Sequence, residues 1–200
     1  MEKLKDLQIT LVSSVDELPE IVAVHSRIFS DNVSGVIGRK FLRVFFNRIF
    51  VLPSGVIYAV KDNGKVVGLI AGLTSKKGFY NLSIIFFGAL ATLREIIVNP
   101  KIFILILRHL KRILFFGKCG ADAEIMTMGM LEGYRKLGLG KKLLDSLEDF
   151  FSSKNVKEYE AFTDLEHGKA FAFYEKCGFS KAGEITFMKK RARVYVKSLT

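Results

Sequence analysis

The spacing of apolar residues along this chain switches repeatedly between the two periods of regular secondary structure. Strands are expected where apolar and polar residues alternate or where β-branched residues gather. The strand-like segments are Leu7–Val12, the paired runs within Val56–Leu73, Glu124–Met130, Lys157–Thr163 and two further strands after Phe179. Asn63-Gly64 divides Val56–Leu73, and this pair is suited to positive φ, which predicts a β-hairpin.

Helices are expected where apolar residues recur every three or four positions. The first follows Ser14, which forms a capping-box pattern with Glu17 and opens a helix that runs to about Phe29. The other helix-like segments are Val36–Phe50, Phe79–Phe116 with an interruption at Asn99-Pro100, Leu139–Phe151 and Lys169–Phe179. Gly178 is the expected stop of the last helix.

The order of these elements predicts a mixed α/β sheet flanked by helices. The chain has 200 residues, no internal repeat and no stretch with linker composition. We therefore expect a single domain over residues 1–200.

Charge is the strongest bias in the composition. The formal net charge is +11. Between Asn63 and Ala121 there are nine Lys or Arg residues and a single acidic residue, Glu95. A basic chain favours an anionic partner: a phosphate-bearing cofactor, nucleic acid or an acidic membrane surface.

Cysteine content and apolar runs exclude several classes of protein. Cys119 and Cys177 lie far apart without a C-x-x-C pair, which argues against a thiolate zinc site and a disulfide framework and favours reduced thiols in a cytoplasmic protein. The uncharged run Gly78–Leu93 would span roughly 24 Å as a helix, short of the ~30 Å hydrocarbon core. The N-terminus lacks the apolar segment of a signal peptide.

The segment EGYRKLGLGKKLL (132–144) combines glycines and cations between a predicted strand and a predicted helix. It is not a Walker A loop, because Leu139 follows Gly138 where Lys-Ser/Thr is needed, and Leu143 replaces the third glycine of a dinucleotide fingerprint. The pattern that remains is R-x-x-G-x-G, in which glycines let backbone amides approach a pyrophosphate at a helix N-terminus. A plain strand-to-helix turn with a solvated basic face is the alternative.

Two stretches in the right order resemble the motifs of a known family. Ala123–Leu144, with its R-x-x-G-x-G loop, resembles motif A of the GNAT superfamily of acyl-CoA-dependent N-acyltransferases, and AFAFYEKCGF (Ala170–Phe179) resembles its motif B. The resemblance implies the GNAT fold: a mixed, mostly antiparallel central sheet flanked by helices, here with a helical insert between the third and fourth strands at about 79–120. It also implies acetyl-CoA as cosubstrate and no metal.

The resemblance assigns roles to individual positions. Glu124 corresponds to the glutamate that accepts the amine proton, and Tyr174 to the tyrosine that protonates the leaving thiolate. The implied contacts with the coenzyme come from Met128, Met130, Arg135, Lys136, Gly138, Leu139, Gly140, Lys141, His167 and Tyr174. Where the family often has an asparagine this chain has His167, to which we assign no catalytic role.

Each of the two catalytic assignments has a structural alternative. Glu124 could be a solvent-facing strand residue, and Tyr174 a core aromatic beside Phe171, Phe173 and Phe179. His25 and His109 lie among apolar residues on predicted helices, so we interpret them as packing or surface residues.

The insert at 79–120 is basic as well as apolar. Three interpretations stay open: a helical pair that covers the sheet or forms a homodimer contact, a lid that attracts an anionic acceptor such as a nucleotide-linked amino sugar, or a peripheral contact with an anionic membrane surface. Nucleic acid is not an expected partner, because no recognised DNA- or RNA-binding motif accompanies the charge.

The sequence therefore predicts a cytoplasmic enzyme that acetylates a primary amine, with a small molecule or amino sugar favoured as acceptor. A peptide or protein amine is one alternative. A non-catalytic acyl-CoA-binding module with the same fold is the other.

Overall fold

The computed structural model describes residues 6–29, 33–79, 120–165, 168–187 and 190–199. The residues between β3 and β4 that carry most of the predicted insert, 80–119, lie outside this set, as do His109, Cys119 and His167. None of the helices in the described ranges is long and apolar enough to span a membrane.

The first half of the chain builds two helices and three strands. Strand β1 (Leu7–Leu11) is followed by a short 3-10 turn η1 (Val15–Glu17), helices α1 (Leu18–Ile28) and α2 (Val33–Val51), and the hairpin strands β2 (Gly55–Asp62) and β3 (Lys65–Leu73). The predicted capping box is confirmed, since the Glu17 side chain accepts from the Ser14 amide at 3.2 Å. The predicted hairpin turn is also confirmed, with φ of 48° at Asn63 and 77° at Gly64.

The second half alternates strands and helices. It comprises β4 (Ala123–Met130), the turn η2 (Glu132–Tyr134), α6 (Leu139–Ser153), β5 (Glu158–Asp164), α7 (Gly168–Lys176), β6 (Ser180–Phe187) and β7 (Lys190–Ser198). Gly178 has a φ of 85°, as expected of the residue that stops the preceding helix.

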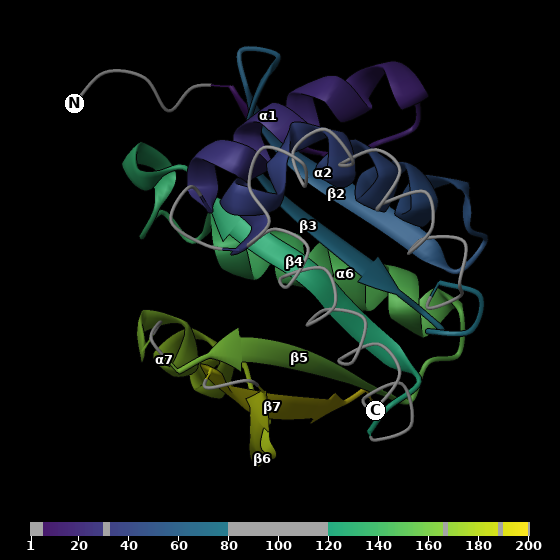
Figure 1. The fold of residues 1–200 in the computed structure, drawn as a ribbon, viewed down its shortest axis with the longest axis vertical. Helices are drawn as coiled ribbons and strands as arrows, with labels where there is room; N and C mark the ends of the chain where they lie inside the picture. The colour runs from purple at the N-terminus through teal and green to yellow at the C-terminus, as the bar shows by residue number, and fades with distance from the viewer. Residues whose placement is uncertain (1–5, 30–32, 80–119, 166–167, 188–189, 200) are drawn as a thin grey trace.

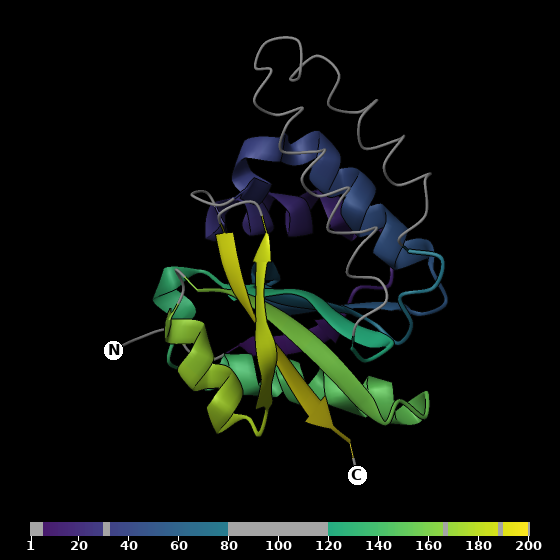
Figure 2. The same cartoon turned by 60° about the horizontal axis from the view of Figure 1, so that its bottom comes forward.

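The strands form one seven-stranded sheet in the order β1-β2-β3-β4-β5-β7-β6 (Figure 1). All neighbouring strands are antiparallel except β4 and β5, which are parallel. Helices α1 and α2 cover one face and α6 and α7 cover the other (Figure 2). The predicted mixed, mostly antiparallel GNAT sheet is thus confirmed.

Each face of the sheet has its own apolar core. On one side Ile21 of α1 and Phe46 and Ile49 of α2 pack on β2 and β3. On the other side α6 packs on β2 and β3 and contributes Leu143 and Leu147, both fully buried, to the core. The two layers hold β4 between them and so define which of its side chains faces which helices.

Candidate functional site

Strands β4 and β5 separate along their length. Their parallel pairing covers three positions only, Ala123 with Tyr159 through Ile125 with Ala161, although β4 continues to Met130 and β5 to Asp164. Figure 1 shows the two strands together at one end and apart at the other. Beyond residue 125, no strand in the described part of the chain pairs with the edge of β4 that faces β5.

A β-bulge lies in β4 where this separation begins. Ala71 of β3 pairs with Thr127 and the next residue, Gly72, pairs with Ile125, so Met126 is an extra residue. Met126 through Gly129 are half-buried, whereas both ends of the strand are buried. The bulge also changes the alternation of side chains, so that Thr127 faces α1 while Met128 faces α6.

The predicted glycine turn follows β4 directly. Gly138 immediately precedes α6 with a φ of 76°, and Lys136 has a φ of 63°. Leu139, the first residue of the helix, is buried and anchors this end, whereas Arg135, Lys136 and Gly138 are exposed. Because φ at Gly138 is left-handed, a residue with a Cβ would be strained there.

The N-terminus of α6 has the chemistry of an anion site. Its N-cap residue, Gly138, has no side chain that could cap it, and its first turn contains no acidic residue. Its amide groups and partial positive charge are therefore available to an anion. Gly140 belongs to this first turn, and a Cβ there would lie 3.3 Å from Phe173 of α7 and 3.4 Å from Met128 of β4.

Two cations of the turn have partners within the protein. Arg135 Nε donates to the Met130 carbonyl oxygen at 3.0 Å, which ties the turn to the end of β4. Lys141 pairs with Asp145 one turn along α6, and this hydrogen bond raises the pKa of the Lys141 ammonium. The predicted residues Met128, Met130, Arg135, Lys136, Gly138, Leu139, Gly140 and Lys141 are thus gathered at the end of β4 and the start of α6.

Tyr174 lies on α7 against the opened part of β5. Its side chain is 7% exposed, and its phenol hydrogen-bonds the side chain of Thr163, beyond the paired stretch of β5. Burial raises the pKa of the phenol, so it is protonated at neutral pH. The aromatic packing expected in the alternative interpretation is present too, with ring centroids 5.0 Å from Phe179 and 5.5 Å from Phe173.

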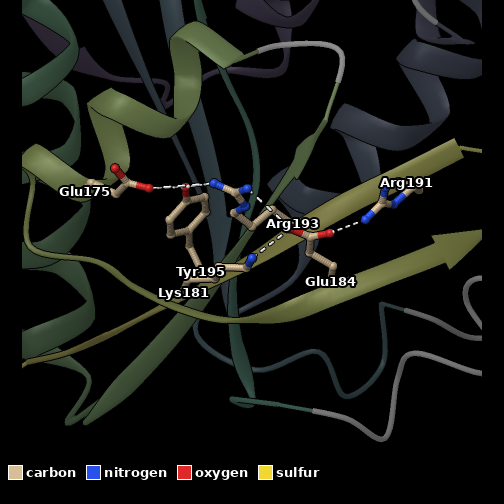
Figure 3. Close-up of polar contacts among 6 residues, drawn as sticks. All are labelled: Glu175, Lys181, Glu184, Arg191, Arg193 and Tyr195. Atoms are coloured by element: carbon tan, nitrogen blue, oxygen red, sulfur yellow. Dashed lines mark hydrogen bonds and ion pairs between the residues drawn. The ribbon is translucent and has the colours of Figure 1, made fainter.

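A polar network that includes Glu175 of α7 holds this helix in position (Figure 3). The Tyr195 ring of β7 stacks on Tyr174 with centroids 5.5 Å apart, and its hydroxyl donates to Glu175 at 2.9 Å. Arg193 donates to the Tyr195 hydroxyl at 3.3 Å, while its guanidinium lies 4.2 Å from the Phe171 ring centroid.

Glu184 of β6 closes this network. Its carboxylate accepts from Lys181 at 2.8 Å, from Arg191 at 2.7 Å and from Arg193 at 3.3 Å, which lowers the pKa of Glu184 to about 2. Arg191 and Arg193 of β7 therefore link the two strands of the β6–β7 hairpin through Glu184, whereas Lys181 lies on β6 with Glu184 (Figure 3).

Glu124 is not a solvent-facing strand residue. It is 5% exposed and lies beside Glu160, its register partner on β5. Both side chains lie on the face opposite α6, because their neighbours Ala123, Ile125, Tyr159 and Ala161 belong to the core on the α6 side. The alternative interpretation of Glu124 was therefore wrong, and the carboxyl is held within the protein where the two strands begin to separate.

Sequence reasoning missed a buried ion pair next to Glu124. Lys76 Nζ lies 2.6 Å from Glu160 Oε1, and both side chains are almost completely buried. Burial raises the pKa of Glu160, and the ammonium of Lys76 opposes this effect. The sequence carried no signal for the pair, since Lys76 belongs to a generally basic stretch and its partner is 84 positions away.

His25 has a polar contact in addition to the packing role expected of it. It is 3% exposed, and its Nε2 lies 3.1 Å from Thr127 Oγ1 on the bulged part of β4. In the described ranges no group of three or more His, Cys, Asp or Glu side chains could hold a metal ion.

Comparison with known proteins shows which family and which solved structures this chain resembles. The model of a family described as "Acetyltransferase (GNAT) family" matches residues 23–179. No curated protein matched the sequence at a significant level.

Three solved structures illustrate the likeness. The ribosomal-protein-S18-alanine N-acetyltransferase from Escherichia coli is 14% identical, with a TM-score of 0.60 over 98% of this chain and 95% of that one. The PaiA N-acetyltransferase from Thermoplasma acidophilum, in complex with coenzyme A, is 13% identical, with a TM-score of 0.56 over 97% and 99%. The spermidine/spermine N-acetyltransferase SpeG from Vibrio cholerae is 13% identical, with a TM-score of 0.57 over 96% and 93%. At these identities the likeness shows a shared fold.

Proposed function

Because this chain belongs to the acetyltransferase (GNAT) family, we propose that it transfers an acetyl group from acetyl-CoA to a primary amine by direct attack in a ternary complex. The whole of residues 1–200 acts as one domain in this proposal. A similarly folded acetyltransferase, PaiA, has been solved with coenzyme A, which supports this choice of cosubstrate.

The separation of β4 from β5 at the Met126 bulge is the observation that carries the proposal. Among the residues that the structure describes, it leaves this edge of β4 without a neighbouring strand over the positions that lead straight into the glycine turn. An extended pantetheine arm can add to such an edge through backbone amides near Met128 and Met130. The diphosphate then meets the uncapped amides of Gly138, Gly140 and Lys141.

The chemistry requires a neutral amine, a stabilised oxyanion and a protonated leaving group. For an amine with the pKa of lysine, deprotonation at pH 7 costs about 4.6 kcal/mol, so a base is needed. Glu124 takes this role in our proposal, a backbone amide of β4 polarises the thioester carbonyl, and Tyr174 protonates the thiolate of coenzyme A. The high pKa of the buried phenol supports the last role, because the proton is present at neutral pH.

The acceptor we favour is a small molecule or amino sugar. An anionic acceptor would suit the net charge of +11. A protein or peptide amine is the second candidate, because one structure of the same fold is named for alanine of a ribosomal protein. Another structure of the same fold is named for the polyamines spermidine and spermine, so the fold alone does not determine which amine is acetylated.

An acceptor screen tests the proposal. Release of the coenzyme A thiol is measured with amino sugars, polyamines, alanine-initiated peptides and simple amines, and acetyl-CoA binding is measured separately by calorimetry. Binding together with amine-dependent release supports an enzyme. Binding with no release from any amine supports a non-catalytic acyl-CoA-binding module, and absence of binding refutes the proposal.

Two variants test the catalytic roles. We expect Tyr174→Phe and Glu124→Gln each to lower kcat by about 100-fold, the lower end of the usual effect of a general acid or base. The matched controls are Tyr159→Phe, a buried tyrosine at the paired end of β5, and Glu20→Gln, a carboxyl on α1 that accepts from the Val66 amide. Full activity in Tyr174→Phe or Glu124→Gln would contradict that residue's role.

A further inference from the structure

Thr127 and His25 form a polar pair between β4 and α1. Their side chains are joined by a 3.1 Å contact between Thr127 Oγ1 and His25 Nε2, although the residues are 102 positions apart in the chain. Apolar side chains of α1, α2, β2 and β3 form the core on this side of the sheet. Each member of this pair needs the other, because a buried polar group without a hydrogen-bond partner is destabilising.

His25 is enclosed by aromatic rings. Its ring centroid lies 4.6 Å from that of Phe29 and 5.2 Å from that of Phe46, and the side chain is 3% exposed. Its second nitrogen, Nδ1, is buried and has no hydrogen-bond partner among the described residues. Burial lowers the pKa of the imidazole to about 4, so the ring is neutral at pH 7.

Thr127 differs from His25 in that it is half-buried. It follows the bulged Met126 and belongs to the stretch of β4 that lies beyond the pairing with β5. It faces α1, whereas Met128 faces the glycine turn on the opposite side of the sheet. Thr127 is therefore the less buried residue of a pair whose other member, His25, lies in the core.

The position of Thr127 corresponds to the side from which an acceptor would arrive. In the proposed function the coenzyme approaches the separated strands from the α6 side. An amine that attacks the thioester then comes from the α1 side, where Glu124 and Thr127 both project from β4. Only Ile125 and the bulged Met126 separate these two residues along the strand.

We propose, building on the function above, that the Thr127–His25 pair is the docking point of the acceptor amine, with Thr127 contacting the amine and His25 acting as a positioning residue. Thr127 Oγ1 has two lone pairs and one hydrogen, so in either tautomer of His25 one lone pair remains for an amine N–H. The hydroxyl is held in one orientation by the imidazole, whose own position is fixed by Phe29 and Phe46.

The neutrality of the pair suits this role. A second carboxylate beside the amine, in addition to the base, would further stabilise the ammonium form of the acceptor and oppose its deprotonation, because an opposite charge favours the charged form. A neutral hydroxyl binds the amine without that penalty. Thr127 and His25 therefore orient the amine, while the proton leaves to another group, Glu124 in our proposal.

Four single variants and one double variant test the pair kinetically, with the fastest amine of the acceptor screen. We expect Thr127→Val and His25→Phe each to raise the KM of the amine by about tenfold, the usual effect of losing one hydrogen bond to a ligand, with an unchanged KM for acetyl-CoA. Thr127→Ser and His25→Gln keep the polar groups and should stay within about threefold of the wild type. The double variant Thr127→Val/His25→Phe should have a KM for the amine no higher than that of the single variant with the higher KM, since both changes remove the same contact.

Some kinetic results would overturn the proposal. An unchanged KM of the amine in Thr127→Val would do so, as would equal losses in Thr127→Val and Thr127→Ser, or strictly additive effects in the double variant. A change confined to the KM of acetyl-CoA would also contradict it, because that would place Thr127 on the coenzyme side.

A measurement without turnover separates this proposal from the proposed function. The imidazole ¹⁵N resonances are recorded in the presence of coenzyme A while n-butylamine is added, and the His25 signal is identified by its loss in His25→Gln. We expect the His25 signal to shift in the wild type and to remain fixed in Thr127→Val. If coenzyme A binds and the His25 signal stays fixed in the wild type, the docking role is wrong although the coenzyme site stands. If coenzyme A does not bind, the proposed function itself fails.

Discussion

Replacement of His25 by glutamine should make the free energy of unfolding depend less on pH below about 6.5. In the folded protein burial lowers the pKa of His25 from 6.5 to about 4. Between these values the unfolded chain binds a proton that the folded protein does not. The free energy of unfolding therefore falls as the pH drops from about 6.5 to about 4, and glutamine, which does not titrate, lacks this contribution.

The magnitude follows from the two pKa values. Linkage gives a loss of about 2 kcal/mol in the unfolding free energy between pH 7 and pH 5, and about 3 kcal/mol once the pH is below the folded value. At pH 7 the contribution is close to zero. His25→Gln should thus cost about 1 kcal/mol at pH 7 through altered packing and hydrogen bonding, but be as stable as the wild type or more stable at pH 5.

Urea unfolding followed by far-UV circular dichroism at pH 7, 6 and 5 measures this effect, because the chain contains no tryptophan for a fluorescence assay. Other groups titrate equally in the two proteins, so the difference between wild type and His25→Gln isolates the imidazole. Parallel curves of unfolding free energy against pH would contradict this expectation, because they would mean that the pKa of His25 is not lowered in the folded protein.

Three further predictions concern the turn, the buried ion pair and the free thiol. Gly138→Ala should lose about 1 kcal/mol of stability through its left-handed φ and weaken acetyl-CoA binding in calorimetry, whereas Gly133→Ala, in open space of the same segment, should do neither. Lys76→Met should lower the unfolding free energy by about 3 kcal/mol because it leaves the Glu160 carboxylate buried alone; an effect equal to that of Lys77→Met, an exposed neighbour, would contradict this. In a Cys119→Ser background, Cys177 should react with Ellman's reagent only after unfolding, because the thiol is buried and its pKa is raised; rapid labelling of the folded protein would show that it is accessible.

Local patterns predicted those parts of the fold that depend on neighbours in sequence. Asn63-Gly64 indicated the hairpin and Ser14 with Glu17 indicated the helix start, because both signals act within four residues. The predicted helix Val36–Phe50 corresponds to the longer α2, whose first turn precedes the apolar repeat. The glycine turn was placed correctly for a similar reason, because its glycines lie directly between a strand pattern and a helix pattern; the left-handed φ of Gly138 was seen only in the structure.

Features that depend on distant partners could not be predicted in this way. The bulge at Met126 arises from the register between β3 and β4, and without it Thr127 would face α6 instead of His25. The burial of Glu124 and Glu160 could not be predicted from their own strands, since burial depends on what covers a sheet. The motifs located the end of β4 and helix α7. The side chains that contact β4 and β5 from other parts of the chain, His25 of α1 and Lys76 after β3, have no motif of their own.

A structure of the protein with bound coenzyme A would show whether the separated strands and the glycine turn form the coenzyme site. We expect the diphosphate to lie on the amides at the start of α6, next to Gly138 and Gly140, and the sulfur to lie between the separated parts of β4 and β5, within reach of the Tyr174 hydroxyl. A coenzyme bound elsewhere, or one whose sulfur points away from Tyr174 and the bulge at Met126, would contradict it.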